Sequence, residues 1–153
     1  MRRKVLVVED DPDQLEVTRL SLRAAGFAIG TASNGIEALK KAQTVSPDLI
    51  LLDVMMPGLN GFAVCETLRE NPATASIPVL MLTGLCSHIS QLVAFDSGAT
   101  DYLMKPFVPD ELISKVEKLL SRAQRLAGQQ KTNPEKNSSS SHKPLPDILS
   151  DDK

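Results

Sequence analysis

Short runs of β-prone apolar residues recur along the first two thirds of the chain, and they constrain its fold more than any other feature. The clearest runs cover residues 4–8, 49–52, 79–82 and 101–104, and a weaker run at 27–33 is diluted by alanine and glycine. Continuous apolar runs are typical of strands that are covered on both faces, so we place the weaker run at a sheet edge. Segments with helical spacing lie between these strands. This alternation predicts a parallel sheet with right-handed crossovers and helices on both sides.

The first two predicted helices have well-marked starts. Asp11 suits the N-cap of the first helix, Pro12 its first position, and Gln14 the position at which a capping box is closed. Asn34 followed by Glu37 repeats this signal for the second helix. In all, the spacing predicts five helices, over residues 12–25, 36–45, 61–69, 87–97 and 110–125.

Composition indicates one globular domain followed by a tail. The chain has 153 residues, of which 42% are hydrophobic and 24% charged, and its formal net charge is −2. Residues 128–153 hold a run of four serines and three prolines with almost no periodicity. We therefore expect a domain over residues 1–127 and a disordered polar tail over 128–153. Since the chain is not basic and nothing after Ala127 could form a helix-turn-helix, we expect no direct DNA binding.

The sequence also predicts a cytoplasmic protein that does not associate with membranes. The basic N-terminus lacks the long apolar stretch and cleavage site of a signal peptide. No segment approaches the ~18 apolar residues that a membrane span needs. Cys65 and Cys86 do not form a C-x-x-C pair and are most simply interpreted as reduced thiols.

Polar residues stand where four of the apolar runs end. Glu9 and Asp10 follow the first run, and Asp53, Thr83 and Lys105 end or follow three later ones. Because ligands of an open parallel sheet bind at the carboxyl ends of its strands, these five side chains could share one pocket. Clustered carboxylates call for a hard divalent cation such as Mg²⁺, and a lysine and a hydroxyl suit a phosphoryl group. Taken singly, Thr83 is more often a strand-end cap and Lys105 a surface charge.

The chain resembles the receiver domain of the two-component response regulators, from residue 2 to about 124. The resemblance rests on the motifs at residues 7–12, 53–61, 82–84 and 98–107, in this order and with matching spacings. It implies a flavodoxin-like, doubly wound α/β fold, in which five parallel strands lie in the order 2-1-3-4-5 with five helices. It also implies a stand-alone receiver, because the tail offers no second domain.

The same resemblance implies a phosphoacceptor and a metal site. Asp53 would take a phosphoryl group from a phosphohistidine, on a sensor histidine kinase or a histidine phosphotransfer protein. Glu9, Asp10, Asp53 and the main-chain carbonyl of Met55 would hold Mg²⁺.

It further implies a switch. Thr83 and Lys105 would contact the phosphoryl oxygens, and Tyr102 would swing inward as Thr83 moves. The change would alter the surface of the fourth helix, fifth strand and fifth helix, and so the binding of a downstream protein. The only reactions catalysed would be phosphorylation and dephosphorylation of Asp53 itself. We expect a monomer, or a weak dimer that depends on phosphorylation.

The sequence disfavours two classes of enzyme. A nucleotide-dependent enzyme would need a G-x-G-x-x-G or P-loop motif, and neither occurs. A phosphatase with an aspartate nucleophile would want a second acid two residues after Asp53, where Met55 stands instead. A docking module that takes no phosphate, and an intermediate in a phosphorelay, remain open on the same fold. The sequence also leaves open the isomer of the Lys105–Pro106 bond.

Overall fold

A computed structural model of the chain describes residues 2–84 and 88–132. It divides into two compact units, Met1–Leu120 and Ser121–Lys153. All of the strands and the first four helices belong to the first unit, so the sheet, both cores and the candidate site are features of that unit.

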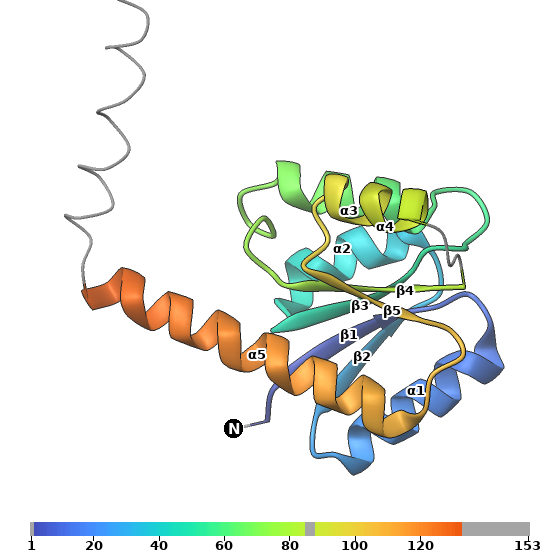
Figure 1. The fold of residues 1–153 in the computed structure, drawn as a ribbon, viewed down its shortest axis with the longest axis horizontal. Helices are drawn as coiled ribbons and strands as arrows, with labels where there is room; N and C mark the ends of the chain where they lie inside the picture. The colour runs from blue at the N-terminus through green and yellow to red at the C-terminus, as the bar shows by residue number, and fades with distance from the viewer. Residues whose placement is uncertain (1, 85–87, 133–153) are drawn as a thin grey trace, which may run out of the picture. The chain divides into compact units, whose positions relative to one another are not determined.

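The centre of the first unit is a five-stranded parallel sheet (Figure 1). In chain order its strands are β1 (Lys4–Val8), β2 (Ala28–Ala32), β3 (Leu49–Asp53), β4 (Val79–Thr83) and β5 (Asp101–Met104). They lie side by side in the order β2-β1-β3-β4-β5. The predicted fold is therefore confirmed, including the position of the weak strand at an edge.

Five helices connect and follow the strands: α1 (Pro12–Ala24), α2 (Gly35–Val45), α3 (Gly61–Glu70), α4 (His88–Asp96) and α5 (Pro109–Thr132). The predicted start of the fourth helix, Ser87, lies outside the described residues. The last helix continues to Thr132, seven residues beyond the predicted end at Arg125. Residues 128–132 of the expected tail are thus helical, and the rest of that tail lies outside the described residues.

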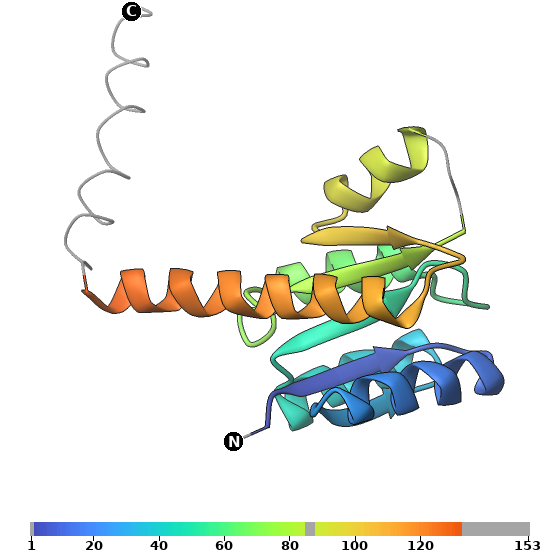
Figure 2. The same cartoon turned by 60° about the horizontal axis from the view of Figure 1, so that its bottom comes forward.

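The helices form two layers, one on each face of the sheet (Figures 1 and 2). One core joins α2, α3 and α4 to strand residues Leu6, Val8, Ala32, Ile50, Leu52, Val79 and Met81. The other joins α1 and the first turns of α5 to Val5, Val7, Leu49, Leu51, Leu80, Leu82 and Leu103. Successive residues of a strand point to opposite faces, so Val5–Val8, Leu49–Leu52 and Val79–Leu82 are apolar at every position and fill both cores.

The start of α1 follows the prediction in one respect and departs from it in another. The Asp11 carboxylate caps the helix by accepting from the backbone N–H groups of Asp13 and Gln14, at 2.9 and 3.5 Å. Gln14 does not close a capping box. The N–H of Asp11 donates instead to Oε2 of Glu9, at 3.3 Å. The Gln14 side chain is therefore free of that task and is used elsewhere.

Gly61, the first residue of α3, fixes the distance between that helix and the end of β3. A Cβ atom at this position would lie 2.5 Å from the carbonyl oxygen of Asp53 and 2.8 Å from Cα of Val54. Both neighbours are backbone atoms that cannot move aside cheaply, so only glycine allows this approach. The helix start thereby supports the strand end that carries Asp53.

Two further expectations bear on this part of the chain. Cys65 is a buried free thiol, and Cys86 lies outside the described residues. None of the helices in the described part of the chain combines the length and the apolar character that crossing a membrane requires.

Candidate functional site

The register of the sheet brings four strand ends to the same edge. Asp53 is the last residue of β3 and pairs with Leu82 of β4, and Thr83 pairs with Met104 at the end of β5. Glu9 follows β1, and its backbone N–H continues the ladder to the carbonyl of Ala32, at 3.0 Å. The polar residues that the sequence placed at strand ends therefore converge.

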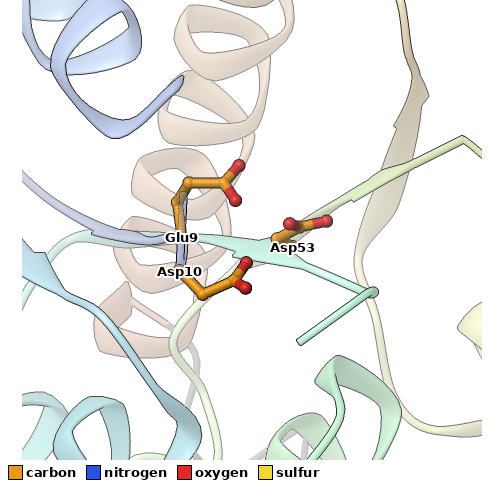
Figure 3. Close-up of side chains that lie close together, drawn as sticks. All are labelled: Glu9, Asp10 and Asp53. Carbon is orange, nitrogen blue, oxygen red and sulfur yellow. The ribbon is translucent and has the colours of Figure 1, made fainter. Parts of the chain in front are cut away.

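Three carboxylates form the centre of this edge (Figure 3). Glu9, Asp10 and Asp53 each offer an oxygen atom, and these atoms lie within 4.8 Å of one another. Glu9 and Asp53 are only 4% exposed, whereas Asp10 is open to solvent. The ends of β1 and β3 thus form an acidic pocket with two buried carboxylates and one solvent-exposed carboxylate.

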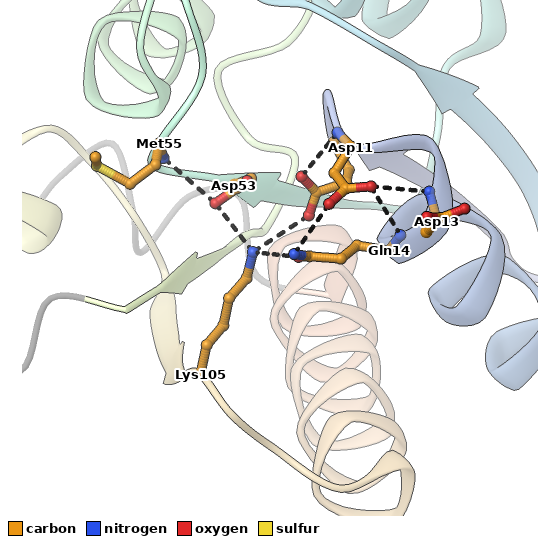
Figure 4. Close-up of polar contacts among 7 residues, drawn as sticks. Asp11, Asp13, Gln14, Asp53, Met55 and Lys105 are labelled. Atoms are coloured by element: carbon orange, nitrogen blue, oxygen red, sulfur yellow. Dashed lines mark hydrogen bonds and ion pairs between the residues drawn. The ribbon is translucent and has the colours of Figure 1, made fainter.

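Lys105 reaches into this pocket from the residue after β5 (Figure 4). Its ammonium Nζ lies 3.2 Å from Oε1 of Glu9 and 3.3 Å from Oδ1 of Asp53. Its backbone N–H donates to the carbonyl of Thr83 at 2.8 Å, and its peptide bond to Pro106 is cis. The lysine is thus held by the ends of three other strands and neutralises part of the pocket's negative charge.

The electrostatics of the pocket show most clearly at Glu9. Burial raises the pKa of its carboxyl from 4.5 to about 7, aided by a hydrogen bond and by charge repulsion from Asp53. The Lys105 ammonium and the N–H of Asp11 act in the opposite direction. Desolvation and a like charge both disfavour the ionised form. A second cation at this edge would relieve that cost.

The donor set fits a magnesium ion. Mg²⁺ prefers oxygen ligands and usually keeps several waters, so it is bound by a few carboxylates with access to solvent. Glu9 and Asp53 supply buried oxygens, and Asp10 leaves the cluster open on its exposed side. The structure brings together the predicted carboxylates; the carbonyl of Met55 as a further ligand stays a prediction.

The other predicted residues occupy different places. Thr83 is buried at the end of β4, beside the pocket. The N–H of Met55 donates to Oδ1 of Asp53 at 3.3 Å, while its residue is 63% exposed. Tyr102 is not in the pocket: its ring packs edge-on against Phe95 of α4, with centroids 5.5 Å apart.

Sequence reasoning missed the role of one residue, Gln14. Its Oε1 accepts a hydrogen bond from Lys105 Nζ at 3.0 Å, and its Nε2 donates to Oδ2 of Asp11 at 3.4 Å (Figure 4). A signal was available, because helical side chains lean toward the helix N-terminus. A long polar side chain in the first turn of α1 therefore points back toward the strand ends.

The chain is similar to several known response regulators. It is 42% identical over 123 residues to the DNA-binding dual master transcriptional regulator RpaA of Synechocystis, covering 80% of this chain and 51% of that protein. It is also 42% identical over 122 residues to the DNA-binding response regulator MtrA of Mycolicibacterium smegmatis, covering 80% and 52%. The solved structure of the chemotaxis protein CheY4 of Vibrio cholerae superimposes with a TM-score of 0.74 at 35% identity, covering 77% of this chain and 98% of that one. The chain spans about half the length of the curated relatives it matches.

The first two relatives correct one prediction. We expected no direct DNA binding, from the net charge and from the tail, and that prediction is wrong because these relatives are DNA-binding regulators. Charge and composition describe only the residues over which they are counted. The matched part of this chain is a receiver domain, and its charge says nothing about a DNA-binding segment of a longer protein.

A family model gives the most direct assignment. The model described as the response regulator receiver domain matches residues 5–117, which include β2 to β5, all of β1 except Lys4, the acidic pocket and Lys105. Receiver domains are signalling modules. The strand order and the carboxylate pocket at the strand ends agree with this match. The chain belongs to the response regulator receiver domain family.

Proposed function

We propose that this receiver domain works as a switch that is phosphorylated on Asp53. The observation that carries the proposal is the position of the Asp53 carboxylate, which is buried at a strand end between Lys105 and two further carboxylates. A buried aspartate held by an ammonium group, at the mouth of an acidic cluster, is suited to accept a group that brings its own negative charge.

The phosphoryl group would come from a phosphohistidine on a histidine kinase or a histidine phosphotransfer protein. An Asp53 carboxylate oxygen attacks phosphorus and forms the P–O bond of an aspartyl phosphate. The P–N bond breaks, and the imidazole leaves with the bonding electrons and takes up a proton from solvent. Such transfers depend mainly on positioning and on neutralising charge. The receiver domain thus promotes only its own modification.

Three groups of this chain support the transfer. The Lys105 ammonium would neutralise a phosphoryl oxygen next to the Asp53 oxygen that it already contacts at 3.3 Å. The Thr83 hydroxyl, buried at the next strand end, would donate a hydrogen bond to another. Glu9, Asp10 and Asp53, with the Met55 carbonyl, would hold Mg²⁺, which when bound supplies positive charge to the phosphoryl oxygens.

The output surface would be formed by α4, β5 and α5. Tyr102 lies between Phe95 of α4 and Lys115 of α5, whose Nζ is 5.8 Å from the centre of the tyrosine ring. Phe95 and its neighbours Leu92 and Val93 are exposed apolar side chains. A rotation of Tyr102 that followed Thr83 would remove the edge-on contact and rearrange this surface. Such a surface would then bind its partner differently in the two states.

The test is the intact mass after incubation with a small phosphodonor, such as acetyl phosphate or phosphoramidate, and Mg²⁺. We expect a gain of one phosphoryl group, about 80 Da, in the natural protein and none in Asp53→Asn. The gain should also vanish when Mg²⁺ is removed by a chelator. Absence of the gain with every donor would overturn the proposal and favour a docking module that takes no phosphate.

A further inference from the structure

The Lys105 ammonium contacts three side chains, and the nearest of them is not a carboxylate. Its Nζ lies 3.0 Å from Oε1 of Gln14, compared with 3.2 Å for Glu9 and 3.3 Å for Asp53. An ammonium group has three N–H donors, so these three acceptors account for all of them. Gln14 is therefore one of three contacts that set the position of the lysine.

The three partners differ in what phosphorylation does to them. In the proposed function Asp53 becomes an acyl phosphate and loses its carboxylate charge, and Glu9 turns to the cation. Gln14 is neutral and belongs to neither event. It is the one partner whose ability to accept from Lys105 is the same before and after the transfer.

Gln14 is itself fixed from the other end of its amide. Its Nε2 donates to Oδ2 of Asp11, and the other oxygen of that carboxylate caps α1. The orientation of the amide is thereby set, with Oε1 directed toward Lys105 (Figure 4). The first turn of α1 thus holds the acceptor that fixes one N–H of the lysine.

Open space beside Lys105 explains why a contact with Gln14 would matter. A cavity of about 500 Å³ opens between α1 and the segment after β5, with Gln14 and Lys105 in its lining. Apolar side chains of Val17, Leu82 and Phe107 form much of its wall. Without an acceptor at position 14, the flexible lysine chain could leave the pocket and extend into this space.

We propose that Gln14 is a positioning residue for phosphorylation, and that it keeps the Lys105 ammonium beside Asp53 while the other two partners change. The inference rests on the proposed function of Asp53. Gln14 touches neither the phosphoryl group nor the metal in this account and acts through Lys105 alone.

The test compares three variants with the natural protein. Gln14→Leu removes the acceptor at nearly constant size, and Gln14→Glu keeps an oxygen at the same reach. Glu16→Gln is the matched control, because Glu16 is exposed on the same helix and pairs with Arg19 and not with Lys105. Initial rates of phosphorylation by phosphoramidate are measured at saturating Mg²⁺, and thermal unfolding checks that each variant folds.

Since the Gln14 contact is exposed, we expect a loss of about threefold in the rate for Gln14→Leu, near the lower end of the net contribution of an ordinary protein hydrogen bond. Gln14→Glu should restore at least half of the rate, and Glu16→Gln should match the natural protein. A rate for Gln14→Leu equal to that of the natural protein would overturn the proposal. So would an equal loss in Gln14→Glu.

A second readout needs no phosphodonor. The ¹⁵N signal of the Lys105 ammonium is assigned by its loss in Lys105→Arg. Its relaxation should show a more mobile ammonium group in Gln14→Leu and the natural mobility in Glu16→Gln. If the natural protein takes no phosphate at all, the proposed function fails and this signal still decides whether Gln14 positions the lysine. An unchanged signal would overturn the positioning role.

Discussion

The receiver domain holds two half-buried cations at opposite ends of its strands, and their partners differ in kind. At the carboxyl ends, Lys105 meets two carboxylates and one amide. Near the amino ends of β4 and β5, the Arg69 guanidinium meets the carbonyls of Ala75, Ile77 and Gly98, at 3.0, 2.6 and 2.8 Å, and the Thr100 hydroxyl at 3.3 Å. One cation has two carboxylates among its partners, while the other has only neutral partners.

The chemistry of the partners decides whether a half-buried cation can be displaced. Backbone carbonyls have no alternative ligand and lose a hydrogen bond if the arginine leaves. Arg69 therefore fastens the end of α3 to the loops that precede β4 and β5, whatever the state of the pocket. In the proposed function the carboxylates around Lys105 instead exchange part of their contact with the lysine for Mg²⁺. Carboxylate partners that can bind either cation would allow the Lys105 contacts to change with phosphorylation. The neutral carbonyl partners of Arg69 would keep its contacts the same in both states.

The strongest test of this comparison is Arg69→Met. The substitution keeps most of the aliphatic stem and removes four hydrogen bonds, leaving three half-buried carbonyls without this donor. We expect a loss of about 3 kcal/mol in the free energy of unfolding, measured in urea. The rate of Asp53 phosphorylation in the folded variant should change less than twofold.

Arg23→Met is the control for this variant, since Arg23 is an exposed cation on α1 and its loss removes the same charge. It should leave the urea midpoint nearly unchanged. A small loss for Arg69→Met would show that its four hydrogen bonds contribute little to stability. A loss that Mg²⁺ reverses would show that Arg69, like Lys105, depends on the carboxylate pocket.

Lys105→Met tests the other half of the comparison. It leaves Glu9 and Asp53, both 4% exposed, facing each other without the ammonium. We expect a loss of about 1.5 kcal/mol in unfolding free energy in the presence of a chelator at neutral pH, because Glu9 must then either stay ionised beside Asp53 or take up a proton, and both cost free energy. Saturating Mg²⁺ should restore most of this loss, since ligand binding to the folded state stabilises it.

The same Mg²⁺ titration on Arg69→Met supplies the control. Mg²⁺ should stabilise that variant and the natural protein by equal amounts. If Mg²⁺ stabilises Lys105→Met no more than the natural protein, the lysine and the metal do not compete for the same carboxylates.

The two cations were not equally predictable from the sequence. Lys105 stands in a motif, next to Pro106 and after an apolar run, so local pattern and resemblance both pointed to it. Arg69 lies in an ordinary amphipathic helix, and its partners Gly98 and Thr100 are 29 and 31 residues away. The strands were predicted because burial on both faces leaves a local signature, whereas a side chain that joins distant loops leaves none.

The same reasoning explains what was missed in the pocket. The convergence of Glu9, Asp53 and Lys105 follows from the rule for parallel strands, which is a property of the fold class. The contact between Gln14 and Lys105 spans 91 residues and depends on how α1 lies beside the end of β5. The raised pKa of Glu9 is likewise a consequence of burial, which only the packed structure supplies.

The last and smallest effect is a dependence of stability on pH that only the Lys105 pocket should show. Burial and the neighbouring Asp53 raise the pKa of Glu9 from 4.5 to about 7. The folded state therefore holds a proton that the unfolded state has lost, and stability decreases as pH rises from 5.5 to 7.5. Without Mg²⁺ we expect a decrease of about 1 kcal/mol in unfolding free energy, after allowance for solvent screening.

Glu9→Gln, which mimics the protonated carboxyl, should flatten this dependence on pH, while Arg69→Met should keep it at lower overall stability. A slope of the same size in Glu9→Gln would place the titrating group elsewhere and leave Glu9 charged in the metal-free pocket, with Lys105 as a sufficient counter-ion.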